Sequence, residues 1–377
     1  MIMQRPAVQS EFSFELAGWD DDSSIRQLLK SNPVPGQITV GFEREPSYFL
    51  GCEVMGPGCQ VLVARRRSDG RLVGLANRVT LPMFVNGQVE RVGYLSQLRV
   101  DRCYRGRWLV SGGFRYLREL HEQQPVSGYI TTLIDGNAQA AGVLVKRARP
   151  HFPVYRELDQ FSTLAILLKA GHRRNRLRGE VTAGSNSDLP EIVSFLQRAG
   201  RSRQFFPLMG CAEFQGHPRT RGFSAGDFLV ARKNGDIAGV VGLWDQSEYK
   251  QTVVREYSQL LGWLRPLLHV LARVAGFSGL PKAGTQLRAL CASFLCVEDS
   301  DPAIFDRLLN HACGRAEAGG YAVLLLALSK RDPLFRVASR RMHVRYDGKL
   351  YSVCWPNQAG FHNNLDNRVP YFDAACL

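Results

Sequence analysis

The sequence predicts a mixed α/β fold, in which helices cover a sheet of parallel and antiparallel strands. The prediction depends on two repeated patterns and on the order of the elements. Leu-Val-Ala-Arg occurs at 62–65 and again at 229–232, each time followed by a polar turn with glycine and a second apolar run. Turn glycines accept positive φ, so both segments are expected to be β-hairpins. Gly-Tyr opens a buried, strand-like segment at 128–129 and again at 320–321.

The first half is expected to alternate strands with helices. Residues 12–17 alternate as a strand, and residues 20–23 supply acidic and serine caps for a helix through Ile25, Leu28 and Leu29. After the hairpin, the pattern predicts a long strand at 89–100, a helix through 114–120, a strand at 129–134, a helix at 137–146 and an apolar strand at 161–168. Strands mixed with helices in this order imply a mixed sheet covered by helices.

The second half repeats this order with an insertion. It is expected to contain a strand at 180–183, a helix capped at 187–188, the second hairpin, a strand at 287–297, a helix at 302–316, a strand at 321–328 and a closing strand near 348–355. The hairpins lie 167 residues apart (229 − 62) and the Gly-Tyr pairs 192 (320 − 128), so the second half carries about 25 extra residues. The apolar helix at 257–275 accounts for them, and we expect it to pack in the core or between domains.

These patterns predict two domains. Residues 1–170 form the first, residues 180–377 form the second, and residues 171–179 form a basic linker. The segment from Lys169 to Gly179 has five basic residues and no acidic one. A solvated linker is the favoured interpretation of this segment, and a phosphate-binding arm is the alternative.

Composition limits the class of protein and its partners. Hydrophobic residues make up 45% and charged residues 22%, which excludes a disordered or fibrous chain. The 48 Lys and Arg against 34 Asp and Glu give a net charge of +14, and all but eight of the basic residues are arginine. Arginine favours two-point contact with phosphate or carboxylate, so a phosphorylated cofactor or nucleic acid is a plausible partner.

Cysteines and apolar segments bear on location. The nine cysteines include no C-x-x-C pair and several lie in apolar runs, which favours reduced, buried thiols in the cytoplasm. The apolar stretch at 260–277 is interrupted by polar residues and proline, so neither a membrane span nor a membrane partner is expected. The eight histidines are scattered without metal-ligand spacing, so no metal is expected.

The segment from Gly93 to Leu120 carries the strongest functional pattern. A strand ends near Val100, an arginine-rich turn follows, and a helix begins at once. Helix N-termini offer unpaired N–H groups to anions. Arg105 and Arg107 add charge, and Gly106 allows the backbone to approach a ligand closely. A diphosphate is the expected guest.

This stretch, LRVDRCYRGRWLV, resembles the strand–turn–helix motif of the GNAT superfamily of N-acetyltransferases. The resemblance implies two tandem GNAT-like domains, with acetyl-CoA bound by the first. Trp108 and Val110 stand where that motif has glycine and glycine or alanine. Asn137 resembles the family's pantetheine-binding asparagine. Leu144 stands where many relatives have a tyrosine that acts as the general acid for the leaving thiolate. The residues that the resemblance assigns to acetyl-CoA are Leu98, Arg99, Val100, Arg105, Gly106, Arg107, Trp108, Leu109, Val110 and Asn137.

Acetyl transfer to an amine requires a base, an oxyanion donor and a proton for the thiolate. Glu90 lies where relatives often hold a carboxylate base, and Tyr94 and Ser96 follow it at alternate positions on one face of the strand. Glu90 and Tyr94 are therefore the candidate catalytic residues, although an exposed strand charge and a core tyrosine are the more common interpretations of such residues. Tyr129 and Tyr155 are further candidate acids. Backbone N–H groups of the long strand are the candidate oxyanion donors.

The second half is expected to have lost cofactor binding. Acidic residues replace the arginines at its corresponding turn, where they would repel a diphosphate: Glu298, Asp299, Asp301 and Asp306. The whole chain is thus interpreted as an N-acetyltransferase acting on a small amine or peptide by direct attack. The alternatives are a non-catalytic acyl-CoA-binding or sensor protein and a nucleic-acid-binding protein. Nucleic acid is the weaker alternative, because the basic residues are spread over both halves and no recognition motif is present.

Overall fold

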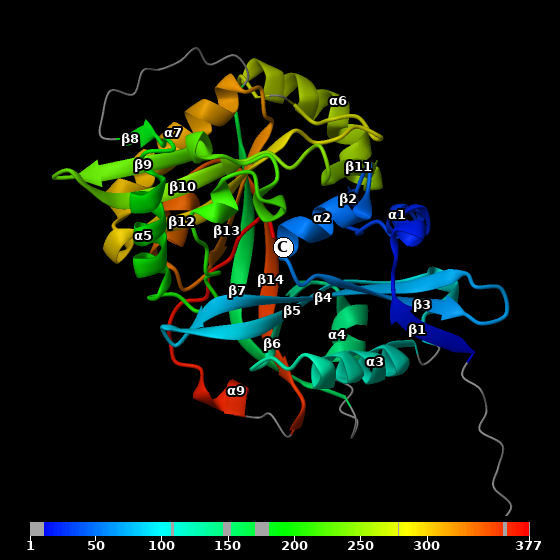
Figure 1. Cartoon of the computed structure of the whole chain (residues 1–377). Helices are drawn as coiled ribbons and strands as arrows, with labels where there is room; N and C mark the ends of the chain where they lie inside the picture. Colours follow the sequence, from blue (N-terminus) through cyan, green and yellow to red (C-terminus); the bar gives the residue numbers. More distant parts are fainter. Residues whose placement is uncertain are drawn as a thin grey trace, which may run out of the picture.

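A mixed sheet runs through the chain, and helices cover both of its faces (Figure 1). The computed structural model describes residues 11–106, 109–145, 152–169, 181–277, 279–356 and 360–376. Within these residues the sheet has 12 strands, with both parallel and antiparallel pairs. The predicted mixed α/β fold class is therefore confirmed.

The predicted elements occur in the predicted order, and further elements lie among them. In the first half they are β1 (Phe12–Leu16), α1 (Asp22–Lys30), β2 (Ile38–Glu43), α2 (Tyr48–Met55), β3 (Gln60–Arg66), β4 (Leu72–Val85), β5 (Gln88–Val100), α3 (Leu109–Gln123), β6 (Tyr129–Ile134), α4 (Ala138–Leu144) and β7 (Val154–Leu167). In the second half they are β8 (Val181–Ala183), α5 (Leu189–Gly200), β9 (Phe228–Lys233), β10 (Asp236–Trp244), β11 (Gln251–Tyr257), α6 (Gln259–Val274), β12 (Ala289–Val297), α7 (Pro302–Ala318), β13 (Val323–Ser329), α8 (Pro333–Ala338), β14 (His343–Cys354) and α9 (Gly360–Asn364).

The two halves share the sheet by exchanging strands. The strand order is β1-β3-β4-β5-β6-β14-β7-β13-β12-β10-β9-β8. The last strand of the first half, β7, pairs with β13, and the last strand of the second half, β14, pairs with β6. β7 and β14 also pair with each other along most of their length. The halves therefore meet through hydrogen-bonded strands, and the division at 170 and 180 stays a prediction; the predicted linker at 171–179 lies outside the described residues.

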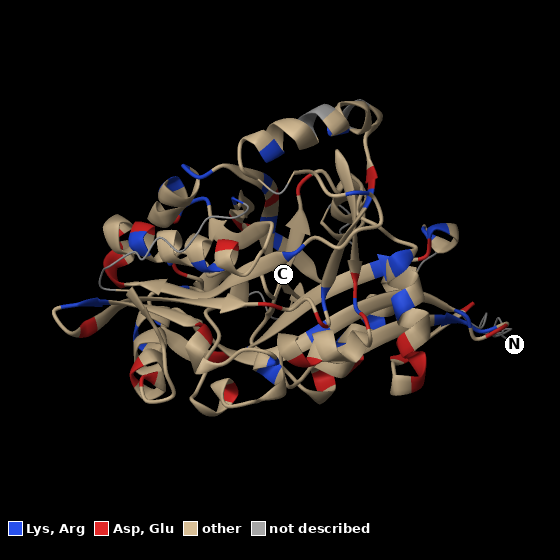
Figure 2. Cartoon of the chain, turned by 90° about the horizontal axis from the view of Figure 1, so that it is seen from above, with Lys and Arg blue, Asp and Glu red and all other residues tan. Residues whose placement is uncertain are grey.

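Helices from each half pack on both faces. In the view of Figure 1, α3 and α4 lie below the first-half strands, and α1 and α2 lie above them. Leu117 and Leu120 of α3 pack with Tyr129, whereas Ile25 and Leu28 of α1 pack on the opposite face. In the second half, α7 and α5 likewise contribute to separate apolar clusters on opposite faces. Lys and Arg lie on both halves among Asp and Glu (Figure 2).

An additional two-stranded sheet joins the halves above the main sheet. It pairs β2 from the first half with β11 from the second, and neither strand was predicted from the sequence. The insertion in the second half is therefore β11 together with α6. The expectation that this helix packs in the core is wrong, because its described apolar side chains are exposed, with Trp263 at 89%. No helix in the described part of the chain combines the length and hydropathy needed to cross a membrane.

Candidate functional site

Strands β5 and β6 separate at the centre of the first half. We call such a separation of two parallel strands a splay. Their parallel ladder joins Gly93–Leu95 to Tyr129–Thr131, and in the described residues it extends no further. The register of β5 against β4 then shifts, because Gln97 adopts a positive φ of 57° and forms a bulge. β5 continues to Val100, so its last residues offer backbone groups to a ligand lying between the strands.

Three side chains of β5 beside this gap lie on the face of the sheet that α1 and α2 cover. Tyr94, Ser96 and Arg99 pair across the ladder with Val79, Asn77 and Leu75, which lie on that face. The hydroxyl of Tyr94 lies 3.2 Å from Thr132 Oγ1 on β6. Burial raises the pKa of Tyr94 to about 12, so the phenol keeps its proton at neutral pH. Ser96 Oγ is buried and has no hydrogen-bond partner among the described residues.

The other predicted catalytic residues lie elsewhere. Glu90 shares the face of Tyr94 but precedes Ser96 by six residues, about 20 Å along an extended strand. Tyr129 lies on the α3 face, where its hydroxyl accepts from Arg78 Nε at 2.9 Å and lies 3.0 Å from His121 Nδ1. Tyr155 also packs on the α3 face, against the ring of Phe114, and burial raises its pKa. Neither Tyr129 nor Tyr155 faces the gap with Tyr94.

The predicted diphosphate loop follows β5 directly. Arg105 spans two elements, because its guanidinium donates to Asn32 Oδ1 after α1 and to Gln139 Oε1 on α4, at 2.9 and 3.2 Å. Gly106 has a φ of 84°, and open space surrounds the position of a Cβ there. Arg107 and Trp108 lie outside the described residues. α3 begins at Leu109, so its N-terminal N–H groups face this loop.

The remaining predicted cofactor residues differ in exposure. Leu98 is exposed at the free edge of β5, and Val100 is partly buried. Leu109 is buried with Tyr104. Val110 packs on the apolar cluster around Leu117 and Leu120, which we call the α3 cluster, so both side chains contribute to the core. Asn137 caps α4 by accepting from Ala140 N at 3.0 Å.

The second half contains a bulge of the same form. β12 and β13 pair in parallel at Ala289–Cys291 and Val323–Leu325, and Phe294 then takes a positive φ of 54°. Each bulge residue follows a serine, Ser96 in β5 and Ser293 in β12. The shared Ser-x-Leu pattern is a sequence signal that the repeat comparison could have found, and the sequence analysis missed it.

At the second bulge, the chain's own carboxylate occupies the equivalent position. Asp373 is 6% exposed and accepts hydrogen bonds from Ser293 Oγ at 2.9 Å and from Phe294 N at 3.3 Å. Tyr371 donates to the same carboxylate at 2.8 Å. The ring of Phe294 packs with Phe214, Phe223 and Trp244. The second splay is thus filled by protein, and Asp301 caps α7 after it by accepting from Ala303 N and Ile304 N.

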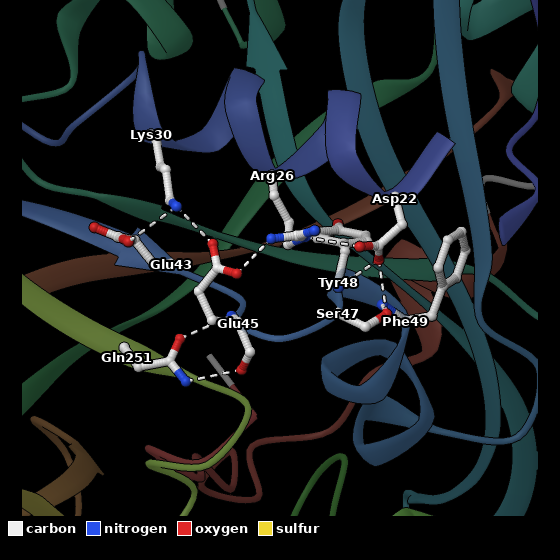
Figure 3. A network of polar contacts seen from close by, with 9 residues as sticks. All are labelled: Asp22, Arg26, Lys30, Glu43, Glu45, Ser47, Tyr48, Phe49 and Gln251. Carbon is white, nitrogen blue, oxygen red and sulfur yellow. Dashed lines mark hydrogen bonds and ion pairs between the residues drawn. The ribbon is translucent and has the colours of Figure 1, made fainter. Parts of the chain in front are cut away.

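A polar network joins α1, the start of α2 and β11 (Figure 3). Asp22 of α1 accepts from Ser47 Oγ and Tyr48 N, both at 2.7 Å, and so anchors the start of α2. Glu45 pairs with Lys30 at 2.6 Å, and the side-chain amide of Gln251 hydrogen-bonds both backbone polar groups of Glu45 at 2.9 Å. Helix α1 and the start of α2 are therefore tied to β11 of the second half.

A cavity of about 680 Å³ lies elsewhere, among the loops of the second half. It is lined by Asn186 and by residues between Phe214 and Ser224, none of which belongs to β5, β6 or α3. In the described part of the chain no three His, Cys, Asp or Glu side chains are grouped as a metal would require. The site at the splay of β5 and β6 is therefore defined by hydrogen-bonding groups and arginines.

The fold is similar to three kinds of solved structure. No family model matches the sequence, and no curated protein matches it. Saccharomyces cerevisiae N-myristoyltransferase with bound myristoyl-CoA has a TM-score of 0.61 at 11% identity, over 93% of this chain and 84% of that one. A GCN5-related glucosamine N-acetyltransferase region of a fungal multi-domain β-N-acetylglucosaminidase has a TM-score of 0.59 at 14% identity, over 93% of this chain and 39% of that one.

A probable N-acyltransferase from Enterococcus faecalis V583 has a TM-score of 0.50 at 9% identity, over 92% of this chain and 74% of that one. All three neighbours have GNAT-type folds and align with nearly the whole chain. Identities this low establish the fold alone. The predicted resemblance is thereby confirmed at the level of structure: this chain has the fold of the GNAT-type N-acyltransferases.

Proposed function

We propose that the protein is an acyl-CoA-dependent N-acyltransferase whose reaction centre is the splay of β5 and β6. It transfers an acetyl or longer acyl group to a primary amine by direct attack. The observation that carries the proposal is the repeated bulge. At the second bulge a serine hydroxyl and a backbone N–H bind a carboxylate, and at the first the equivalent serine is buried without a partner. The first bulge therefore has the groups of an oxyanion site, and its serine hydroxyl is free to donate to a ligand's oxyanion.

The donor lies along the free edge of β5. Its pantetheine arm pairs with the backbone of Leu98 and Val100, and its diphosphate binds at the loop from Arg105 to Val110 before α3. Arg105, exposed beside this loop, supplies charge and a two-point contact. The bound myristoyl-CoA of the yeast neighbour supports a nucleotide thioester as the donor. The acyl chain can therefore be longer than acetyl.

The reaction needs three groups at the splay. The amine nitrogen attacks the thioester carbonyl carbon, and the negative charge that develops on the oxygen is held by Ser96 Oγ–H and Gln97 N–H. The C–S bond then breaks, and Tyr94 donates its proton to the leaving thiolate. The raised pKa of Tyr94 suits a proton donor, because the phenol is protonated at neutral pH. The amine loses its proton to a base.

Glu90 stays the sequence-based candidate for that base. At about 20 Å from Ser96 along the strand it would act through intervening water. Replacing Glu90 by glutamine should then slow turnover mainly at low pH, where more of the acceptor amine is protonated. An unchanged pH–rate profile would remove Glu90 from the mechanism.

Calorimetry and thiol release test the function together. Acetyl-CoA and myristoyl-CoA are titrated into the protein, and amines are then added while free thiol is measured. Binding of either thioester followed by amine-dependent thiol release is the expected result. Absence of binding by both thioesters would refute the proposal.

Binding without turnover is the second candidate function. Leu144 replaces the tyrosine expected in many relatives, and its side chain is buried in the α3 cluster. A protein that binds acyl-CoA as a sensor would need no such acid. In that case the thioester binds in calorimetry, and no amine releases thiol. Salt-sensitive binding of an oligonucleotide in place of both thioesters would favour the nucleic-acid alternative.

A further inference from the structure

Three basic side chains gather above β5, between the two halves. Arg44 follows β2 and is 7% exposed. Lys250 precedes β11 and packs on the same residue of α2 as Arg44 does, because a Cβ on Gly51 would lie 2.9 Å from Arg44 Cδ and 3.8 Å from Lys250 Cγ. Arg99 lies on β5, two residues after the bulge. We call Arg44, Arg99 and Lys250 the basic cluster.

Carboxylates are missing from this cluster. Among the described residues, none of its three members forms an ion pair within 4 Å, and each donates to a backbone carbonyl. The acceptors are Glu43 O for Arg44 at 2.9 Å, Leu98 O for Arg99 at 3.0 Å and Ala375 O for Lys250 at 2.5 Å. The two acids adjacent in sequence pair elsewhere, Glu43 with Arg255 and Glu45 with Arg26 and Lys30.

Among the described residues two other arginines are buried: Arg219, like Arg44, donates only to a backbone carbonyl, Leu208 O at 3.2 Å, whereas Arg78 has a full set of acceptors. Arg78 is fully buried, and its guanidinium donates to Tyr129 Oη, Gln60 Oε1 and Gln124 O. Arg203 pairs with the carboxylate of Asp332. Arg44 has neither a carboxylate nor a full set of acceptors in the described residues. Burying a cation without either is costly, so a ligand is expected to provide the missing anion.

The electrostatics of the basic cluster agree with an anion-binding site. Burial lowers the pKa of Arg44, and the charge of Arg99 lowers it further. Burial also lowers the pKa of Lys250 to about 8, with Arg44 as the next cause. Asp373 acts on Lys250 in the opposite direction, but its carboxylate is already bound by Ser293 and Phe294. The neighbouring positive charges therefore disfavour one another's charged forms, and a bound anion would offset this repulsion.

The position of the cluster indicates which substrate carries the anion. Arg99 shares the face of β5 with Tyr94 and Ser96, so the cluster borders the proposed reaction centre on the side of α1 and α2. The proposed diphosphate loop comes after β5, at the start of α3. We propose that the basic cluster binds a carboxylate of the acceptor, so that the acceptor is an amino acid or another amine that carries a carboxylate. The assignment of this anion to the acceptor depends on the proposed function. The binding of an anion by the cluster depends on the cluster alone.

Matched acceptors test the substrate class. L-Phenylalanine and L-leucine are compared with phenethylamine and isopentylamine, which lack only the carboxylate. We expect the wild type to acylate the amino acids with kcat/KM roughly 10- to 100-fold above the amines. Arg44→Met should remove most of this preference through KM and leave the amines unaffected, and Arg99→Met should remove the preference as well. Arg255→Met, which removes a neighbouring but paired arginine, is the control and should keep the preference.

Thermal unfolding tests the anion site without turnover. Sodium acetate should raise the unfolding midpoint of the wild type above that in sodium chloride of equal ionic strength, and should not do so in Arg44→Met. Without acetate, Arg44→Met should unfold about 2 °C higher than the wild type, because an uncompensated buried charge is gone. Arg99→Met gives the same test where Arg44→Met fails to fold.

The two experiments separate the proposals. If no amine is acylated, the proposed function fails, and the acetate experiment still decides the anion site. Equal acetate stabilisation in wild type and both variants would overturn the basic cluster as an anion site. Loss of acetyl-CoA binding in Arg44→Met would also overturn the inference, since the anion would then belong to the donor. Equal use of amino acids and matched amines by the wild type would overturn it as well.

Discussion

The two splays of the sheet have the same backbone geometry and different contents. In both, a short parallel ladder ends, a serine follows, and the next residue adopts a positive φ, 57° at Gln97 and 54° at Phe294. At the second splay, the Asp373 carboxylate and a group of aromatic rings fill the space. At the first, Ser96 Oγ is buried without a partner among the described residues.

The difference shows how the same backbone arrangement can form part of the core in one half and a candidate ligand site in the other. A buried donor costs free energy unless an acceptor reaches it. The second half satisfies its donors with its own carboxylate, which removes any need for a ligand. In the first half the equivalent hydroxyl has no partner among the described residues, and an arginine-bearing loop and a helix N-terminus follow the same strand. Chemistry is therefore expected at the first splay and structural stability at the second.

The largest expected effect is on donor binding. Arg105→Glu places a negative charge beside the loop proposed for the diphosphate, so acyl-CoA binding should be abolished. Calorimetry with acetyl-CoA measures this loss, and circular dichroism checks that the fold is retained. Lys233→Glu, an equal change of charge in the second-half hairpin, should leave the affinity unchanged. Normal affinity in Arg105→Glu would place the diphosphate elsewhere.

Replacing the two serines tests the comparison directly. Ser96→Ala should lower kcat about 100- to 1000-fold with little change in acyl-CoA affinity, because a donor to the transition-state oxyanion is lost. Ser293→Ala should leave kcat unchanged and lower the free energy of unfolding by about 1–3 kcal/mol, because the Asp373 carboxylate loses a buried donor. Stopped thiol-release assays and urea unfolding provide the two readouts. Equal effects of both variants on kcat would mean that the serines have only structural roles.

A smaller effect is expected at Tyr94. Tyr94→Phe removes the proposed proton donor and should lower kcat by about 100-fold at neutral pH while the thioester still binds. Thr132→Val removes only the neighbouring hydroxyl and should cost less than tenfold. Wild-type turnover by Tyr94→Phe would assign the proton of the thiol to water.

The hairpins, the long strand and the helix after it could be predicted because local patterns encode them. Strand β5 begins within one residue of its predicted start, and Asn137 caps the helix that it was expected to open. The strand exchange could not be predicted, because β7 and β14 are antiparallel partners that differ little in pattern from strands of a self-contained sheet. Exposure of α6 was missed because an apolar helix with no partner has the same periodicity as a buried one.

The candidate site was predicted in part for a related reason. Tyr94 and Arg105 lie on segments whose residue types suggest their chemistry. The bulges are not encoded by local preference, since Gln97 and Phe294 are not residues that favour a positive φ, and tertiary contacts hold them there. Arg44 and Lys250 are distant in sequence, and only the pairing of β2 with β11 brings them together. Such clusters become visible only in three dimensions.

The smallest expected effect is on stability against pH, and it belongs to the filled splay. Burial raises the pKa of Asp373 above 3.8 despite four hydrogen bonds to its carboxylate. The folded state then holds a proton that the unfolded state has released, so the free energy of unfolding falls as pH rises from about 3.8 through the folded pKa. Asp373→Asn should remove this fall in urea titrations at several pH values, and Ser96→Ala should keep it. A pH profile unchanged in Asp373→Asn would mean that hydrogen bonds offset the burial of Asp373, and the second bulge would then hold a fully charged oxyanion, as the first is proposed to do during the reaction.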